Sequence, residues 1–158
     1  MAQALIALGS NLGDSRAILE AAIETLNKKP GIQVKTHSSW YETPPLGPPQ
    51  PNYLNGCALL ETEITPEDLL TTLLEIEREF GRVRREKWGP RIIDLDLLLF
   101  DNLIQQTPQL QVPHPQMRQR AFVMIPLAEI VPNWIDPITG KTIAELAKNI
   151  DTTGINKL

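Results

Sequence analysis

Two carboxylates interrupt the most apolar segment of the chain. Asp94 and Asp96 stand in residues 92–100, IIDLDLLLF, where every other side chain is hydrophobic. Burying an unpaired charge is costly, and strand side chains two positions apart share one face at a spacing of roughly 6.5 to 7 Å. We therefore expect Asp94 and Asp96 to point together out of a strand whose hydrophobic residues face the core. Such a pair suits Mg²⁺, and salt bridges to nearby arginines on an exposed strand face are the competing interpretation.

The segment before these aspartates is strongly cationic. Residues 81–91 contain four arginines and one lysine, and Gly81, Gly89 and Pro90 prevent a continuous helix there. Arginine presents a planar fork to phosphate oxygens, and phosphoryl transfer is catalysed mainly by positioning and charge neutralisation. Neither common glycine-rich phosphate cradle is present in the sequence. A mobile cationic loop beside a metal site therefore predicts a polyphosphate substrate, whereas without the aspartates a solvated charged loop would be the better interpretation.

Composition limits the class of protein. The 158 residues are 42% hydrophobic, enough for one compact domain, and the net charge of −4 argues against nucleic acid as a partner. The first residues lack the basic region of a signal peptide, and no apolar run approaches membrane-spanning length. We expect a cytoplasmic monomer that acts on small molecules. Cys57, the single cysteine, lies in an apolar stretch and is expected to be buried and structural.

The elements that must position these residues follow from hydrophobic periodicity and capping signals. In chain order, the expected elements are a strand at 4–8, a helix from Asp14 or Ser15 to Pro30, strands at 34–42 and 53–62, a helix from Thr65 to Gly81, a strand at 92–100 and a short helix at 120–131. The first six have the order of a ferredoxin-like α+β fold, an antiparallel sheet with helices packed on one face. This arrangement leaves the other face for a ligand, and no linker divides residues 1–158.

Four motifs resemble one known family. Residues 88–98, WGPRIIDLDLL, resemble the signature of the hydroxymethyldihydropterin pyrophosphokinases. The family's other motifs follow in the same order: ALGSNLG at 7–13, YETPPLG at 41–47, and VPHP at 112–115 with RAFV at 120–123. The resemblance implies a single pyrophosphokinase domain that transfers pyrophosphate from ATP to 6-hydroxymethyl-7,8-dihydropterin. The products would be AMP and the pterin diphosphate, an intermediate of folate biosynthesis.

The resemblance also implies roles for individual residues. Asp94 and Asp96 would be catalytic and would hold two Mg²⁺ ions on the ATP phosphates, with Arg82 and Arg91 as further catalytic residues. The nucleotide side would be bound by Arg84, Trp88, His114, Arg120 and Glu77, although Glu77 could equally be an exposed helix carboxylate. The pterin would be bound by Thr43, Pro44, Leu46, Tyr53, Asn55 and Phe122. Aromatic faces around one polar amide suit a flat heterocycle, although either aromatic taken alone would more simply be a core residue.

Two other functions compete with this interpretation. A different Mg²⁺-dependent nucleotidyl- or phosphotransferase could use the same paired aspartates, but it would not need the expected pterin pocket. A non-enzymatic ferredoxin-like module, for example one that binds RNA, is disfavoured by the acidic composition.

Gln116, Gln109 and Leu74 replace basic or polar residues found near the nucleotide in some family members. The sequence therefore predicts the chemistry more firmly than the nucleotide affinity.

Overall fold

The chain folds around one antiparallel sheet. The computed structural model describes residues 1–44, 49–81 and 92–158. The sheet contains β1 (Ala2–Ser10), β2 (Ile32–His37), β3 (Tyr41–Thr43), β4 (Tyr53–Thr62), β5 (Asp94–Phe100) and β8 (Asn156–Lys157). Its lateral order is β5-β1-β4-β3-β8, and β2 pairs with β4 beside β3. The predicted antiparallel α+β sheet is confirmed.

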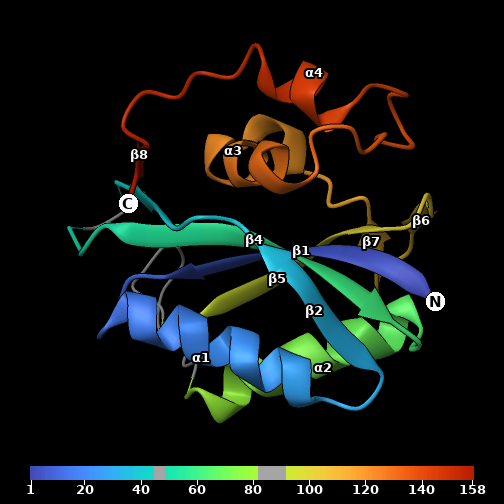
Figure 1. Ribbon diagram of the computed structural model, residues 1–158, viewed down its shortest axis with the longest axis horizontal. Helices are drawn as coiled ribbons and strands as arrows, with labels where there is room; N and C mark the ends of the chain where they lie inside the picture. The colour runs from blue at the N-terminus through green and yellow to red at the C-terminus, as the bar shows by residue number, and fades with distance from the viewer. Residues whose placement is uncertain (45–48, 82–91) are drawn as a thin grey trace.

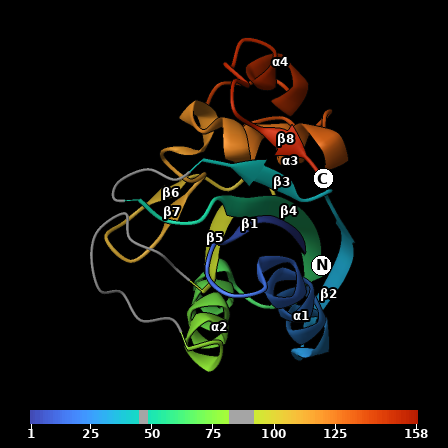
Figure 2. The same cartoon turned by 90° about the vertical axis from the view of Figure 1, so that its left-hand side faces the viewer.

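Helices cover both faces of this sheet (Figures 1 and 2). The helices α1 (Ser15–Lys28) and α2 (Pro66–Glu79) pack on one face, as the ferredoxin-like order predicts. The opposite face carries α3 (Ala121–Ile130) and α4 (Ile143–Ala147), so much of the face that we expected to be open is covered. Among the described residues, no helix is long and apolar enough to cross a membrane.

The helix boundaries follow from local capping. Asp14 caps α1 by accepting a hydrogen bond from the backbone N–H of Ala17 at 3.2 Å. Thr65 caps α2 by accepting from the N–H of Asp68 at 3.1 Å, and a proline occupies the first helical position. A side-chain acceptor at this position satisfies a backbone N–H that has no partner within the helix. Both predicted helix starts are confirmed.

The strand predicted at 34–42 is divided in two. β2 ends at His37 and β3 begins at Tyr41, and beside this break the indole of Trp40 packs over Gly56 of β4. A Cβ atom at Gly56 would lie only 2.5 Å from that ring. Across the break, the Ser38 hydroxyl accepts a hydrogen bond from the N–H of Cys57 at 2.9 Å. A side chain therefore replaces the neighbouring backbone where the ladder is interrupted.

Two hydrophobic clusters lie on the two sides of the sheet. Ile6, Leu8 and Leu97 belong to the cluster under α1 and α2. Leu5 and Cys57 belong to the cluster under α3 and α4. Burial raises the pKa of the Cys57 thiol, which supports the prediction of a structural rather than a nucleophilic cysteine. Because side chains alternate along each strand, one sheet contributes hydrophobic residues to two cores, one on each face.

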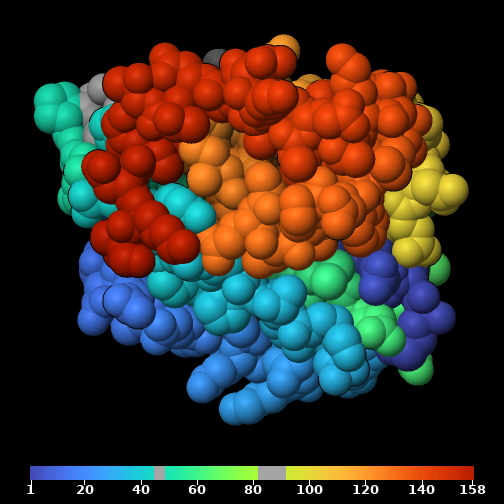
Figure 3. Space-filling model, turned by 45° about the horizontal axis from the view of Figure 1, so that its top comes forward, coloured from blue at the N-terminus to red at the C-terminus, as the bar shows by residue number. Residues whose placement is uncertain are grey.

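Several short elements of the structure were not predicted from local sequence patterns. These are β6 (Gln105–Gln106), β7 (Gln111–Val112), the 3₁₀ helix η1 (Met117–Gln119), α4 and β8. The C-terminal segment runs from α4 over α3 to the sheet, where β8 pairs with β3, and α3 and this segment form the outer surface on that side (Figure 3). Elements of two to five residues have too few positions to establish a periodicity.

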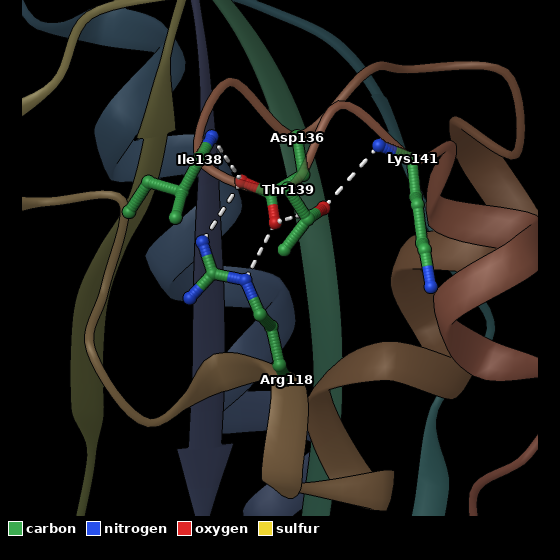
Figure 4. A network of polar contacts seen from close by, with 5 residues as sticks. All are labelled: Arg118, Asp136, Ile138, Thr139 and Lys141. Carbon is green, nitrogen blue, oxygen red and sulfur yellow. Dashed lines mark hydrogen bonds and ion pairs between the residues drawn. The ribbon is translucent and has the colours of Figure 1, made fainter.

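One buried ion pair joins the C-terminal segment to η1 (Figure 4). Asp136 is completely buried, and its two carboxylate oxygens accept hydrogen bonds from Nε and Nη2 of Arg118 at 2.5 and 2.8 Å. The same carboxylate accepts from the N–H of Ile138 at 3.1 Å and the hydroxyl of Thr139 at 2.9 Å. Four donors on one carboxylate offset much of the cost of burying its charge.

We expect Asp136 to make stability depend on pH. Burial raises the pKa of Asp136, but the hydrogen bonds from Arg118, Ile138 and Thr139 lower it by a larger amount. The pKa of Asp136 therefore lies below its ordinary value. A carboxyl group with a lowered folded-state pKa stabilises the protein above its unfolded pKa of about 3.9. That contribution is lost as the pH falls through the folded-state pKa.

The variant Asp136→Asn should therefore reduce the free energy of unfolding by about 3 kcal/mol at pH 7. Below about pH 4, the difference between wild type and variant should shrink, because Asp136 takes up a proton first in the unfolded state and only at lower pH in the folded state. Urea unfolding followed by circular dichroism at several pH values measures this difference. A difference that stays constant down to pH 3 would show that the charge of Asp136 does not stabilise the fold.

Candidate active site

Strand register brings the predicted metal and pterin residues onto one face. Asp94 of β5 lies opposite Gly9 of β1, and Gly9 lies opposite Asn55 of β4. Asp96 lies opposite Ala7 in the same way. Directly paired residues project to the same face of a sheet, and this is the face that α3 covers farther along the strands. Asp94, Gly9 and Asn55, which are far apart in sequence, therefore form one lateral row across three strands.

The two aspartates alternate with buried leucines as predicted. Asp94 and Asp96 are half-buried, whereas Leu95 and Leu97 are 3% and 4% exposed. A bulge then interrupts this alternation, because Leu5 and the next residue of β1 pair with Leu99 and Leu97. The skipped residue, Leu98, enters the cluster under α3 together with Leu99. The end of β5 is buried on both faces, because Leu97 and Phe100 belong to the cluster under α1 and α2, and the bulge places Leu98 and Leu99 in the other cluster.

Asn55 is held firmly in place. Its Nδ2 donates a hydrogen bond to the Thr43 hydroxyl at 3.0 Å, and both residues are buried, at 8% and 6% exposure. On the other side, a Cβ atom at Gly9 would stand 2.8 Å from Asn55 Oδ1, so only glycine leaves room for this amide. Tyr53, two residues earlier on the same face, is half-buried. A fixed amide beside an aromatic ring can read the polar edge of a flat ligand.

The segment between His114 and Arg120 reaches the aspartate side of this row. The N–H of His114 donates to the carbonyl of Leu98 at 2.9 Å, which anchors the segment at the bulge of β5. Burial lowers the pKa of His114, the Asp96 carboxylate raises it and Arg120 lowers it, with a lowered pKa as the result. The imidazole is therefore mainly neutral at pH 7. Both Asp96 and Arg120 lie near enough to affect its charge.

Comparison with known proteins agrees with these motifs. The family model described as 7,8-dihydro-6-hydroxymethylpterin-pyrophosphokinase matches residues 5–132. This chain belongs to that family. A Synechocystis protein named 2-amino-4-hydroxy-6-hydroxymethyldihydropteridine pyrophosphokinase is 48% identical over 152 residues, which cover 96% of this chain and 78% of that protein. A protein of the same name from Methylorubrum extorquens is 42% identical over 159 residues, which cover 100% of this chain and 99% of that protein.

Solved structures support the fold of this pyrophosphokinase family member. A crystal structure of wild-type Plasmodium falciparum HPPK-DHPS with pteroate superposes with a TM-score of 0.76 at 15% identity. The match covers 93% of this chain but 42% of the Plasmodium chain. The present chain thus spans less than half of that protein, and at this identity the likeness establishes the fold alone.

Several predicted residues of the pyrophosphokinase site can be located. Asp94, Asp96, Thr43, Tyr53 and Asn55 project from one sheet face, as their strand register requires. Phe122, in the first turn of α3, packs partly buried against the cluster on that face, and Pro44 is exposed directly after β3. Leu46, Arg82, Arg84, Trp88 and Arg91 lie outside the described residues, so their roles stay predictions.

The position of Glu77 excludes one of the two interpretations made from the sequence. It is 4% exposed, so the interpretation as an exposed helix carboxylate is wrong. Its Oε2 accepts a hydrogen bond from the N–H of Leu95 at 2.8 Å. Among the described residues, β5 stands at the end of the sheet order, where no further strand pairs with its outward backbone groups. Glu77 of α2 therefore supports β5 between the two aspartates, and its contact with the nucleotide stays a prediction.

Sequence reasoning overlooked the contribution of Asn11. This buried residue follows β1, and its Nδ2 donates to Gln50 Oε1 at 2.8 Å and to the carbonyl of Pro51 at 3.0 Å. These bonds attach the end of the proline-rich segment to the turn after β1, just before Tyr53. Local rules would not have found these bonds, because the partners of Asn11 lie 39 and 40 positions away in sequence.

We expect Glu77→Leu to loosen β5 at Leu95. The variant would leave the Leu95 N–H without its carboxylate acceptor, at a cost of about 1 to 3 kcal/mol in the free energy of unfolding. Amide hydrogen exchange should become faster at Leu95. Glu77→Gln is the matched control, because its amide oxygen can still accept the bond. Unchanged protection of Leu95 in the leucine variant would contradict the supporting role of Glu77.

Proposed function

We propose that the chain transfers pyrophosphate from ATP to 6-hydroxymethyl-7,8-dihydropterin, a step of folate biosynthesis. Family membership supports this activity, because the curated relatives carry the name of this pyrophosphokinase. The observation that carries the proposal is the row Asp94, Gly9, Asn55 across three adjacent strands. It sets paired carboxylates beside a buried amide, as a metal-bound polyphosphate and a flat heterocycle in contact would require.

The paired aspartates fit two Mg²⁺ ions. Both carboxylates are half-buried on one face, and Mg²⁺ in nucleotide enzymes is commonly held by one or two carboxylates together with substrate phosphates. In this proposal Asp94 and Asp96 are the protein ligands. When bound, the ions would neutralise charge on the ATP phosphates.

The other residues bind and orient the two substrates. Asn55 and Thr43 would read the pterin edge, and Tyr53 and Phe122 would contact its ring. The hydroxymethyl oxygen attacks the β-phosphorus and forms the new P–O bond, while the bond from that phosphorus to the α–β bridging oxygen breaks. AMP leaves with the electron pair, and the hydroxyl proton is released. His114 and Arg120 would hold phosphate oxygens during this exchange.

Residues outside the described part complete the proposal. Arg82 and Arg91 would assist catalysis, and Arg84, Trp88 and Leu46 would bind the substrates. Glu77 and Pro44 are proposed as further contacts, with the nucleotide and the pterin respectively. Residues 1–158 would form a single pyrophosphokinase domain. The cytoplasmic location and the monomeric state stay predictions from the sequence.

The product formed from ATP tests the reaction class directly. We expect AMP to appear in the presence of Mg²⁺ only when 6-hydroxymethyl-7,8-dihydropterin is added, as measured by ion-exchange chromatography. Release of ADP would indicate an ordinary kinase. Release of pyrophosphate would instead support the competing nucleotidyltransferase. Either result would refute the proposed transfer.

Asp94→Asn and Asp96→Asn should each reduce turnover by at least about 100-fold. A metal ion supplies several kcal/mol of charge stabilisation, and about 1.4 kcal/mol corresponds to a tenfold change in rate. Pterin binding in the presence of nucleotide should persist, because these residues do not contact the pterin in the proposal. Asp101→Asn, an aspartate just after the same strand, is the control and should keep turnover. Normal turnover in both site variants would exclude the proposed metal ligands.

A further inference from the structure

The turn from His114 to Arg120 has two different sides. On one side, the N–H of Gln116 donates to His114 Nδ1 at 3.1 Å, and Arg120 Nη2 donates to Gln116 Oε1. The Arg120 guanidinium also lies 5.7 Å from the centre of the Phe122 ring. These contacts connect the two predicted nucleotide residues, His114 and Arg120, through Gln116. This side of the turn thus carries the polar side chains of His114, Gln116 and Arg120.

The other side of the turn faces the protein interior. Met117 is completely buried in the cluster under α3 and α4. Arg118 lies between His114 and Arg120 in sequence, but its guanidinium does not join the contacts of these two residues with Gln116. It is bound by Asp136 instead (Figure 4). Its side chain is 20% exposed and that of Asp136 is 0% exposed. A basic residue at this position would otherwise resemble a third phosphate contact.

The loop that carries Asp136 is closed by backbone hydrogen bonds. The backbone N–H of Asp136 donates to the carbonyl of Lys141 at 2.9 Å, and the carbonyl of Asp136 accepts from the N–H of Gly140 at 2.8 Å. Next to this loop, Ile135 and Thr142 form a β-bridge, and Ile143 is completely buried. The bidentate bond from Arg118 therefore ties η1 to a fixed point, because such a pair restricts orientation as well as distance.

We propose that the Arg118–Asp136 ion pair is a positioning element for the nucleotide side of the active site. By fixing η1, the pair sets the place of Arg120 at the start of α3 and of Gln116 beside His114. This inference rests on the proposed nucleotide contacts of His114 and Arg120. It assigns a role in ATP binding to Asp136, which lies in the C-terminal segment and contacts the site through Arg118.

The test compares ATP with pterin in folded variants. Asp136→Asn and Arg118→Met should each raise the KM for ATP roughly tenfold or more, because small displacements of binding groups are costly. The KM for the pterin and kcat at saturating substrates should stay within about threefold of wild type. The double variant should resemble either single variant, since both changes break the same link.

Two control variants separate positioning from loss of stability or of charge. Ile143→Val removes a buried methylene from the same C-terminal segment and should leave the KM for ATP unchanged. Arg16→Met removes an arginine whose ion pair with Glu20 is exposed, and it should also leave this constant unchanged. If Arg118→Met does not fold, Arg118→Lys keeps the charge without the bidentate geometry, and Asp136→Asn completes the comparison.

The outcomes distinguish three roles. An unchanged KM for ATP in folded variants of both residues would show that the pair is purely structural. Weaker ATP binding in Arg118→Met but not in Asp136→Asn would make Arg118 a direct phosphate contact, and parallel changes in all constants would indicate general destabilisation. Each of these results overturns the proposal.

Calorimetric titration with ATP keeps this test separate from the proposed reaction. A wild-type protein that binds ATP but releases no pterin-dependent AMP would refute the proposed function. The titrations would still decide the positioning role, because they require only ATP binding. Weaker ATP binding in both Asp136→Asn and Arg118→Met, with normal binding in the two control variants, would support it.

Discussion

The pairing register of β5 with β1 is the constraint on which the site depends. In the observed register, Leu95 and Leu97 are buried and the two aspartates face the opposite side of the sheet. A slip of one residue would exchange the two faces. It would bury both carboxylates under α1 and α2 and move Leu95 and Leu97 to the face that carries Asn55. The hydrophobic energy of the core and the placement of the carboxylates therefore favour the same register.

β5 is held by groups from outside the main ladder as well. Glu77 accepts from the N–H of Leu95 between the aspartates, and the carbonyl of Leu98 at the bulge accepts from the N–H of His114. An end strand exposes backbone groups that a neighbouring strand would otherwise bind. In β5, the Glu77 carboxylate and the N–H of His114 bind two of these groups. The strand that carries Asp94 and Asp96 is thus bound to α2 through Glu77 and to the segment before η1 through His114.

The candidate site depends on a second helical layer, which packs on the sheet face that carries Asp94, Asp96 and Asn55. α1 and α2 complete the first core, and α3, α4 and the C-terminal segment build the second on the opposite face. This layer covers the middle of that face and brings Phe122, Arg120 and His114 to its end. Asp136, far from the row of site residues in sequence, belongs to the same layer through Arg118.

The sequence by itself determined the elements that have a long period or a strong cap. The starts of α1 and α2, the span of β4 and the facing of Asp94 and Asp96 follow from local rules, because capping and alternation act between neighbouring residues. The family motifs likewise identified the candidate site. Only the tertiary structure decided the break at Trp40, the burial of Glu77, the bulge at Leu98 and the Arg118–Asp136 pair. Each depends on residues distant in sequence that meet when the sheet and its two layers pack, and no local pattern encodes such a meeting.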